Sequence, residues 1–412
     1  MASVKYNTGK NDEIVSINIR VYKGRDANGK HLSPYTKTVK VPPGTNKKQL
    51  EKFVAKEVEK FEQECAGGYA ENRNVLFRDL AAEVMKLKKL KNLSPTTLSH
   101  YQNMLDDRIL PQFGHMKVTA ITVGHLNNFY HSLTLPGANK KNTEKGLSGK
   151  SIKEVNSLIR SILREAEKML IITRNPADIA TVPEVVYTEP NHYEEEDLEV
   201  IIQDLDTAPI KWKTIGYLLM LYGIRRGEAI GIKSRAIDFK RHTLTIETCV
   251  YYTKENGVFE KLYPKGKKIR VLPMASETEQ LLKEYLLWLD EEKAKYEDMW
   301  TESEFIFTAE GGGIMNPDNV TQYFGRRSKE QRKENENYPH LNPHAFRHTA
   351  ASILINKGTD LVTAADYIGD SVRTMSRTYA HAMTKGKIQA NTIMNNIVFN
   401  KNNNTDSDDE DS

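Results

Sequence analysis

The sequence predicts a multidomain α+β protein with three parts: a small N-terminal β-sheet with one helix, a helical domain, and a mainly α-helical third domain that contains a small antiparallel sheet. The chain of 412 residues is too long for one ordinary core, and its 39% hydrophobic residues are enough to fold two or three. Apolar residues alternate near the start of the chain, which predicts strands, and after residue 74 they recur at helical spacing, which predicts helices. Pro176, Pro183 and Pro190 interrupt this helical pattern, so we place a domain border there.

The first part, residues 1–70, is expected to combine strands and a helix. Apolar residues alternate over 14–21, a second strand is predicted over 35–41, and the stretch between them contains turn-forming glycines. Helical spacing then predicts a helix over 46–64. A two- or three-stranded ribbon of this size fits the DNA major groove. Its basic side chains either contact DNA or only solvate an exposed face; they are Arg20, Lys23, Arg25, Lys37 and Lys40.

The second part, residues 74–183, is expected to be a four-helix domain. Helical spacing extends over 76–90, 121–133 and 151–170, and Ser94 followed by Pro95 marks the start of a further helix. The loop at 136–149 is rich in Gly, Asn and Lys. Lysines near the end of the first helix either line DNA or solvate the helix surface; they are Lys86, Lys88, Lys89 and Lys91.

Charge and cysteine content narrow the class of protein. The net charge is only +4, but residues 1–183 carry 30 Lys and Arg against 18 Asp and Glu, whereas residues 184–412 carry 29 against 37. The basic first half suits a nucleic-acid partner, whose phosphates it neutralises. Cys65 and Cys249 lie far apart and belong to no CxxC motif, so we expect neither a disulfide framework, nor a metal site, nor a cofactor.

The two ends of the chain carry further expectations. Residues 1–10 have no apolar core like that of a signal peptide, and no apolar run reaches the roughly 20 residues of a membrane span. We therefore expect a cytoplasmic protein with no membrane partner. Residues 401–412 are polar and acidic and are expected to be disordered. This tail is either simply solvated or competes with DNA for the basic surfaces of the same protein.

The third part, residues 184–400, contains the residues that carry chemistry. An apolar helix over 215–222 precedes Arg225, and Glu228 is expected three positions later on the same helical face, where it holds the guanidinium in place. Residues 243–269 predict a β-meander with a tight turn at Asn256-Gly257, and a second turn at Lys265 leads into a strand over 269–273. His344 and Arg347 are expected on one face of a helix that stops at Gly358, and Tyr379 on a last helix that begins near residue 371.

Two arginines, a lysine, a histidine and a tyrosine form a set that is able to perform phosphoryl transfer without a metal ion: Arg225, Lys265, His344, Arg347 and Tyr379. Guanidinium groups hold the charge that gathers on the non-bridging oxygens of a phosphodiester. The phenol of Tyr379 is the nucleophile, neutral His344 accepts its proton, and Lys265 protonates the leaving 5′ oxygen. The phosphotyrosyl bond keeps the energy of the broken linkage, so rejoining needs no ATP.

Around these residues the sequence resembles the tyrosine recombinase (phage integrase) family, and its layout is most like that of integrases of conjugative transposons. Residues 221–232 (LYGIRRGEAIGI) resemble the box of the first catalytic arginine and its glutamate, and residues 263–273 (YPKGKKIRVLP) resemble the hairpin of the catalytic lysine. Residues 342–352 (NPHAFRHTAAS) resemble the box of the histidine and second arginine. Residues 367–381 (YIGDSVRTMSRTYAH) resemble the box that ends in the nucleophile. The resemblance implies these roles for the five residues above. Lys267 and Lys268 are the alternatives to Lys265.

One position departs from the family pattern. After Gly369 such proteins usually have His or Trp, which donates a hydrogen bond to the phosphate, whereas this chain has Asp370. An ionised carboxylate cannot donate and repels a phosphate. We expect Asp370 to cap the following helix or to orient a neighbour, and the alternative is that it is protonated.

The resemblance also implies a division of labour. It makes residues 1–70 an arm-type DNA-binding domain, 74–183 a helical core-binding (SAM-like) domain and 184–400 the catalytic domain, followed by the acidic tail. The apolar stripe after Tyr379 resembles a C-terminal helix that docks on a neighbouring subunit, or else it packs on its own domain. The implied partners are double-stranded DNA at crossover and arm sites, further copies of the chain in a homotetramer, and a candidate excisionase or DNA-bending helper protein.

We therefore expect a site-specific recombinase that excises and integrates a mobile element in the cytoplasm of a bacterium, at the nucleoid. Two other functions stay open: a topoisomerase of the same chemistry, and a DNA-binding regulator with a vestigial active site. The arm-like first part argues against the topoisomerase, whereas Asp370 keeps the regulator open. Covalent adducts with DNA distinguish them, because a regulator forms none and a topoisomerase forms them on almost any sequence.

Overall fold

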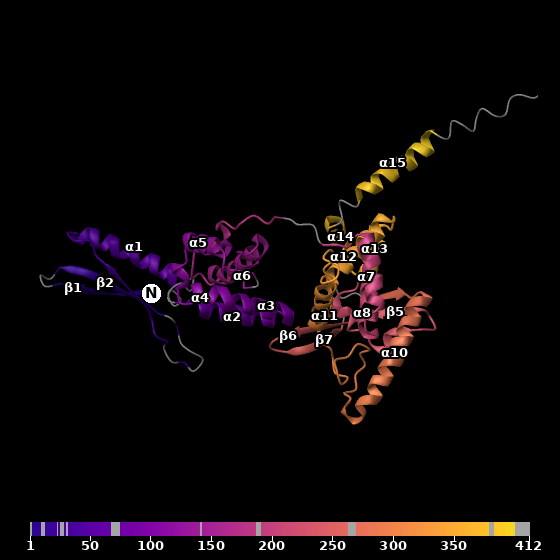
Figure 1. The fold of residues 1–412 in the computed structure, drawn as a ribbon. Coiled ribbons are helices and arrows are strands. Elements are labelled where there is room, and N and C mark those ends of the chain that lie inside the picture. Colours follow the sequence, from indigo (N-terminus) through magenta and orange to yellow (C-terminus); the bar gives the residue numbers. More distant parts are fainter. Residues whose placement is uncertain are drawn as a thin grey trace, which may run out of the picture. The chain divides into compact units, whose positions relative to one another are not determined.

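The computed structural model describes residues 2–9, 13–22, 24, 29, 32–66, 75–140, 142–186, 191–262, 269–378 and 383–399. Its internal contacts divide the chain into two units, Met1–Tyr187 and Thr188–Ser412. The first unit holds a three-stranded sheet and a set of helices, and the second is mainly helical with small antiparallel sheets (Figure 1). The expected α+β architecture is confirmed.

An antiparallel sheet opens the first unit. Its strands β1 (Ala2–Thr8), β2 (Ile14–Val21) and β3 (Tyr35–Lys40) lie in the order β1-β2-β3, and α1 (Lys47–Ala66) packs against one face (Figure 1). Ile17 and Ile19 of β2 are fully buried in a core that they share with Phe61 of α1. The pattern of apolar residues did not single out β1, because its inward side chains include only one aliphatic residue larger than alanine, Val4, and polar residues separate it from Ala2 and Tyr6.

The rest of the first unit is helical. Its elements are α2 (Phe77–Leu90), α3 (Pro95–Met104), the π-helical turn η1 (Leu105–Ile109), α4 (Leu110–Phe113), the 3-10 turn η2 (Val118–Ala120), α5 (Val123–Thr134), α6 (Gly149–Lys168) and the 3-10 turn η3 (Pro176–Asp178). Elements α3, η1 and α4 follow one another directly, so four helical stretches surround one core that includes Phe113 and Ile159. Ser94 caps α3 by accepting the N–H of Thr97 (3.3 Å), as its position before Pro95 predicted.

The second unit is built around the apolar helix α8. Its helices are α7 (Glu195–Asp206), α8 (Ile210–Tyr222), α9 (Arg226–Ala229), α10 (Ser276–Tyr296), α11 (Pro317–Gln331), α12 (Pro343–Asn356), α13 (Leu361–Ile368), α14 (Val372–Thr378) and α15 (Met383–Phe399), with 3-10 turns η4 (Ser234–Ala236) and η5 (Glu297–Met299). Helix α8 contacts α7, α10 and α12, and Leu218 and Leu219 of α8 are fully buried. None of the helices in the described ranges is long and apolar enough to cross a membrane.

The strands of the second unit form two separate sheets. Strands β4 (Ile237–Asp238), β5 (Thr243–Ile246) and β8 (Arg270–Pro273) make one sheet in the order β4-β5-β8, and β6 (Thr248–Thr253) pairs with β7 (Gly257–Leu262) around the turn predicted at Asn256-Gly257. The expectation of a single meander is therefore wrong. The strand after Lys265 pairs with β5 because Leu272 and Leu244, which lie opposite each other, are both buried in the main core of the unit.

Candidate active site

Arg225 and Arg347 come together in the second unit although they lie on distant segments of the chain. Arg225 immediately precedes α9, and Arg347 lies in α12. Both guanidinium groups face the carboxylate of Asp370, whose Oδ2 is 3.1 Å from Nη2 of Arg347 and 3.9 Å from Nη2 of Arg225. Two guanidinium groups that converge on one anionic group are suited to bind a phosphate.

Arg225 contacts Glu228 as expected, but not along a helical face. The backbone of Arg225 is extended (φ −73°, ψ 150°), so Arg225 is the N-cap residue of α9 and Glu228 is its third residue. Oε2 of Glu228 accepts the backbone N–H of Arg225 (3.0 Å), and Oε1 accepts Nη1 of its guanidinium (2.8 Å). The predicted helical spacing is wrong here, and a capping-box arrangement makes the contact instead.

Arg270 is a member of this network that the sequence patterns did not reveal. It lies on β8 with only 4% of its surface exposed, and its guanidinium donates to Glu228 and to the backbone carbonyls of Tyr367 (3.0 Å) and Ile368 (2.5 Å). Glu228, which is fully buried, is thus shared by two arginines. The sequence did contain one signal of this burial. Arg270 lies two positions before Leu272, so the alternation of side chains along a strand places both on the inward face.

Arg347 is held chiefly by main-chain oxygens. Its Nη1 donates to the carbonyls of Gly223 (2.8 Å) and Ile368 (2.6 Å), and its Nη2 donates to the carbonyl of Gly369 (3.1 Å). Burial, and next the positive charge of Arg225, lower the pKa of Arg347 to about 10. The group therefore remains charged near neutral pH.

Two glycines whose carbonyls accept from Arg347 lie where a larger residue would not fit. Gly369 has a φ of 76°, and a Cβ there would lie 2.4 Å from Cζ of Arg270. Gly223 ends α8 with a φ of 55°, and a Cβ there would lie 2.4 Å from Cδ1 of Ile368. Only glycine adopts this backbone conformation without strain and leaves this space free.

His344 lies in the first turn of α12 beside the arginine pair. Asn342 caps this helix by accepting the backbone N–H of His344 (2.9 Å). Burial lowers the pKa of His344, and the positive charges of Arg226, Arg347 and Arg225 lower it further. A neutral imidazole accepts a proton, as the predicted role requires. His348, one turn later, was not singled out from the sequence, and burial together with its neighbours also lowers its pKa.

Asp370 is ionised and contacts the arginines. Burial raises the pKa of its carboxyl, but the hydrogen bond from the N–H of Ser371 and the interactions with Arg347 and Arg225 outweigh that effect and lower the pKa overall. The cap of α14 is made by Ser371, whose Oγ accepts the N–H of Thr374 (3.0 Å). The expected capping role of Asp370 therefore belongs to its neighbour, and the protonated alternative disagrees with the lowered pKa.

Several predicted residues lie outside the described part of the chain. These are Tyr379, Lys265 with its alternatives Lys267 and Lys268, the basic residues Lys23 and Arg25, and the tail 401–412. Their roles stay predictions. Within the described ranges, no group of three or more His, Cys, Asp or Glu side chains converges as it would around a metal ion.

The sheet of the first unit has one face without a covering helix, and this face is entirely polar. The strand register places the following side chains on it: Ser3, Lys5, Asn7, Ser16, Asn18, Arg20, Thr36, Thr38 and Lys40. Arg20 is exposed there and its Nε donates to Asn18 (3.3 Å). Lys37 lies opposite buried Ile19, on the face that α1 covers, and its Nζ is 3.0 Å from Glu64. Contrary to expectation, Lys37 is thus a poor candidate for DNA contact, whereas Arg20 remains a good one.

Arg20 and Lys37 form a matched pair for a DNA-binding test. We expect Arg20→Ala to weaken the binding of the full chain to a random-sequence duplex and to reduce the slope of log K against log salt by about one, because one phosphate contact is lost. Lys37→Ala removes the same charge from the face that α1 covers, where Lys37 pairs with Glu64, so we expect it to leave the slope nearly unchanged. Fluorescence anisotropy over a salt series measures both slopes. An equal reduction for the two variants would contradict the prediction that the uncovered polar face of the sheet binds DNA.

The lysines of α2 differ from one another. Lys86 and Lys89 are exposed, and Nζ of Lys86 is 3.6 Å from Glu83. Lys88 lies over the ring of Tyr101 (5.2 Å to the centroid), and burial lowers its pKa, as does the neighbouring Lys91. Lys86 and Lys89 are the better placed of the three to meet DNA.

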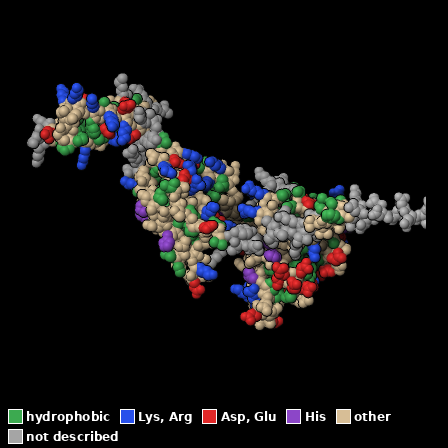
Figure 2. Space-filling model, turned by 90° about the horizontal axis from the view of Figure 1, so that it is seen from above, with side chains coloured by type: hydrophobic (Ala, Val, Ile, Leu, Met, Phe, Trp, Pro, Cys, Tyr) green, Lys and Arg blue, Asp and Glu red, His purple; other side chains and the backbone are tan. Residues whose placement is uncertain are grey.

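Figure 2 shows Lys and Arg side chains on the first unit and a concentration of Asp and Glu on the face of the second unit in view.

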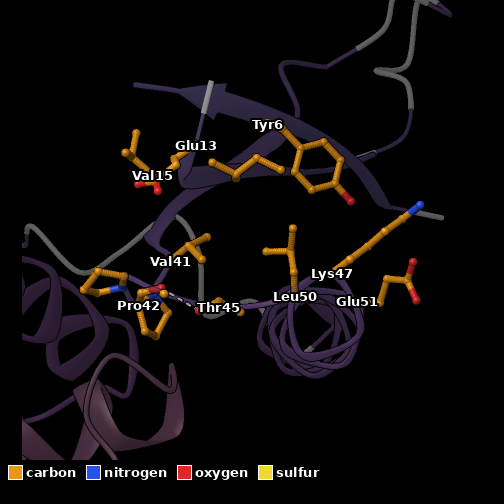
Figure 3. Close-up of a pocket in the computed structure, with 12 residues that line it drawn as sticks. Tyr6, Glu13, Val15, Val41, Pro42, Thr45, Lys47, Leu50 and Glu51 are labelled. Carbon is orange, nitrogen blue, oxygen red and sulfur yellow. Dashed lines mark hydrogen bonds between the residues drawn. The ribbon is translucent and has the colours of Figure 1, made fainter. Parts of the chain in front are cut away.

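A cavity of about 560 Å³ lies in the first unit, where the sheet meets the start of α1. Its lining includes Tyr6, Val41 and Leu50, with Lys47 and Glu51 at the helix (Figure 3). The hydroxyl of Thr45 donates to the carbonyl of Pro42 (2.5 Å) in the turn that leads into α1. This cavity contains none of the residues that the sequence predicted for catalysis, all of which belong to the second unit.

Comparison with known proteins identifies the class. Residues 192–385 match the phage integrase family, and residues 76–134 match the N-terminal SAM-like domain of phage integrases. The chain belongs to the phage integrase family, the tyrosine recombinases, which are enzymes that cleave and rejoin DNA. The resemblance drawn from the sequence motifs is confirmed.

Particular relatives extend this result over most of the chain. A tyrosine recombinase XerC-like protein of Caldanaerobacter subterraneus subsp. tengcongensis is 24% identical, over 92% of this chain and 96% of the relative. The ICEBs1 integrase of Bacillus subtilis is 22% identical, over 82% of this chain and 87% of its own length. The fold is similar to that of the Tn1549 transposon integrase in complex with transposon right end DNA, with a TM-score of 0.62 and 18% identity over 77% of this chain and 98% of that one.

Proposed function

We propose that the protein is a site-specific integrase that excises and integrates a mobile element, of the conjugative transposon kind, through a 3′-phosphotyrosyl intermediate. The observation that carries the proposal is the convergence of Arg225 and Arg347 on one anionic group beside a histidine whose pKa is lowered. The similarity to the ICEBs1 and Tn1549 integrases supports a mobile element as the substrate. The protein would act on DNA in the bacterial cytoplasm, at the nucleoid.

In the proposed reaction, the phenolic oxygen of Tyr379 attacks the scissile phosphorus while the bond from phosphorus to the 5′ oxygen breaks. His344 takes the phenol proton, and Lys265 gives a proton to the leaving 5′-hydroxyl. Arg225 and Arg347 hold the non-bridging oxygens, on which negative charge gathers. The 5′-hydroxyl of the exchanged strand then attacks the phosphorus and gives its proton to Lys265. The bond from phosphorus to the oxygen of Tyr379 breaks, and the phenol recovers its proton from His344.

The three parts of the chain are proposed to share the work on DNA. Residues 1–70 would bind arm sites through the polar sheet face, residues 74–183 would bind the crossover site, and residues 184–400 would catalyse. Separate hydrophobic cores support this division: one under the sheet, one among α2 to α6, and the main core of the second unit. Residues 401–412 would remain an acidic tail.

Four copies of the chain would act together on two DNA sites, joined through α15. Apolar side chains on this helix are between 54% and 65% exposed; they are Ile393, Met394, Ile397, Val398 and Phe399. Ile393 and Ile397 are four residues apart and therefore lie on one side of the helix. An exposed apolar stripe of this kind is typical of a surface that binds another subunit.

Substitutions on α15 test this assembly. We expect the double variant Ile393→Glu, Ile397→Glu to bind DNA as single copies but to lose the higher-order complex, because it places two charges in an apolar interface. Asn391→Glu with Asn396→Glu adds the same charge to polar positions of the same helix and should retain the complex. Mass photometry on DNA measures the stoichiometry. Retention of the complex by the Ile variant would overturn the role of α15.

Covalent capture of DNA tests the proposed function. The full chain is incubated with a library of nicked duplexes, and DNA that stays attached after denaturation is sequenced. We expect adducts at a restricted set of sequences and exchange of strands between two captured sites. The absence of adducts would indicate a regulator, and adducts on almost any sequence without strand exchange would indicate a topoisomerase. A requirement for host-cell extract in excision would support an excisionase or a DNA-bending helper.

A further inference from the structure

Both carboxylate oxygens of Asp370 are fixed in place. Oδ1 accepts the backbone N–H of Ser371 (2.9 Å), and Oδ2 lies 3.1 Å from Nη2 of Arg347 and 3.9 Å from Nη2 of Arg225. The side chain of Asp370 is 27% exposed, so one side of this cluster remains open to solvent. The carboxylate thus lies between the two guanidinium groups on their accessible side.

The opposite edges of both guanidinium groups are already occupied. Nη1 of Arg225 donates to Glu228, and Nη1 of Arg347 donates to the carbonyls of Gly223 and Ile368. Nη2 of Arg225 and Nη2 of Arg347 lie on the side of Asp370, and Nη2 of Arg347 shares its two hydrogens between the carbonyl of Gly369 and Asp370. Among the described residues, these two atoms are therefore the ones placed to meet a non-bridging phosphate oxygen. A carboxylate oxygen is an anionic acceptor like a phosphate oxygen, and it forms the same charge-assisted hydrogen bonds with arginine.

We propose that Asp370 is an internal counter-ion that occupies the phosphate position between Arg225 and Arg347 before DNA binds, and that the scissile phosphate must displace it. The inference rests on the proposed function, in which these two arginines hold that phosphate. Asp370 thereby slows cleavage, and it replaces a side chain that would donate a hydrogen bond with one that competes for the arginines. Asp370 therefore hinders the cleavage of any DNA whose phosphate binds too weakly to displace the carboxylate.

A role of Asp370 in orienting Arg347 is the main competing explanation. Arg347 retains three main-chain acceptors without Asp370, namely the carbonyls of Gly223, Ile368 and Gly369. Arg225 retains both of its contacts with Glu228. The arginines are therefore held in place by groups other than Asp370, so removal of the carboxylate should free the phosphate position rather than disorganise it.

Arrival of a phosphate changes the electrostatics around Asp370. Among the described residues, the charged and titratable groups that face it are Arg225, Arg347 and His348, with Glu228 and Arg270 behind the arginines. A second anion between the same two arginines disfavours the ionised carboxylate, so protonation of Asp370 becomes easier in the complex than in the free protein. Lower pH should therefore weaken the competition between Asp370 and the phosphate.

The test compares wild type with Asp370→Asn, which keeps the shape of the side chain and removes its charge. A nicked duplex that carries a crossover sequence recovered by covalent capture is the substrate, and single-turnover formation of the adduct is followed from about pH 5.5 to 8.5. We expect Asp370→Asn to cleave about tenfold faster at pH 8, because one like charge is removed within a few ångströms of the phosphate. The ratio of variant to wild-type rates should fall toward one as the pH falls. This ratio cancels the titration of His344, which both proteins share.

Asp318→Asn is the matched control, because Asp318 is also paired with an arginine, Arg226 (2.8 Å), but does not contact Arg225 or Arg347 in the described part of the chain. It should change the rate far less than Asp370→Asn. A slower Asp370→Asn at every pH, with an unchanged melting temperature, would overturn the counter-ion role and favour orientation of Arg347. A ratio that is independent of pH would also overturn it. Failure of wild type to form any adduct would instead contradict the proposed function itself.

Discussion

Replacement of Tyr379 by phenylalanine is expected to abolish the covalent adduct with DNA completely. Phenylalanine keeps the aromatic ring but lacks the oxygen that would form the bond to phosphorus, and no other step of the proposed reaction can compensate for a missing nucleophile. The variant should still bind DNA, because the two arginines and the basic surfaces of the first unit are unchanged. Denaturing gels of nicked duplex incubated with each protein measure the adduct, and mobility shifts measure the binding.

Tyr252→Phe provides the matched control for this experiment. Tyr252 lies on β6 with 42% of its surface exposed, so the same loss of a hydroxyl occurs in the same unit outside the proposed catalytic set. This control should form the adduct at close to the wild-type rate. Persistence of the adduct in Tyr379→Phe would show that another residue attacks the phosphate, and the assignment of the last sequence box would fail.

Substitution of Glu228 by glutamine is expected to lower the free energy of unfolding of the second unit by about 3–5 kcal/mol, because it leaves a buried arginine without its counter-ion. Glutamine has the same shape, so no cavity forms. Arg270 is only 4% exposed and loses its only ionic partner among the described residues. Arg225 also loses the carboxylate that holds its guanidinium and its backbone N–H.

Tryptophan fluorescence is a direct measure of this effect. The three tryptophans, Trp212, Trp288 and Trp300, all lie in the second unit, so urea unfolding followed by their emission reports on that unit alone. Glu330→Gln removes an exposed carboxylate from α11 and should change stability by no more than about 0.5 kcal/mol. A loss below about 1 kcal/mol for Glu228→Gln would mean that the buried network contributes little to the fold.

The structural features that the sequence predicted correctly depend on residues that are close together in the chain. The cap at Ser94, the turn at Asn256-Gly257 and the helix that carries His344 and Arg347 each depend on a few consecutive positions, and each is present. The family boxes led to the correct class of enzyme for the same reason. Each of them combines a predicted catalytic residue with the local structure around it.

Features that depend on distant segments were not predicted. Arg270 gains its role only when β8, α9 and the end of α13 meet, and nothing near it in the chain marks that meeting. Strands β5 and β8 lie on either side of the β6–β7 hairpin in the chain. Their pairing depends on a core to which Leu244 of β5 and Leu272 of β8 both contribute. The position of Lys37 was missed because strand register, rather than residue type, decides which face of the sheet a side chain occupies.

The main-chain support of Arg347 has a consequence for engineering. The carbonyl oxygens of Gly223, Ile368 and Gly369 are present whatever side chains surround them. The course of the backbone therefore fixes the acceptors that hold the guanidinium of Arg347. Directed evolution could therefore vary neighbouring side chains to retune the enzyme while the two glycines keep that path. Every residue of this network belongs to the second unit, so a graft that exchanges the N-terminal sheet for another recognition module would leave it untouched.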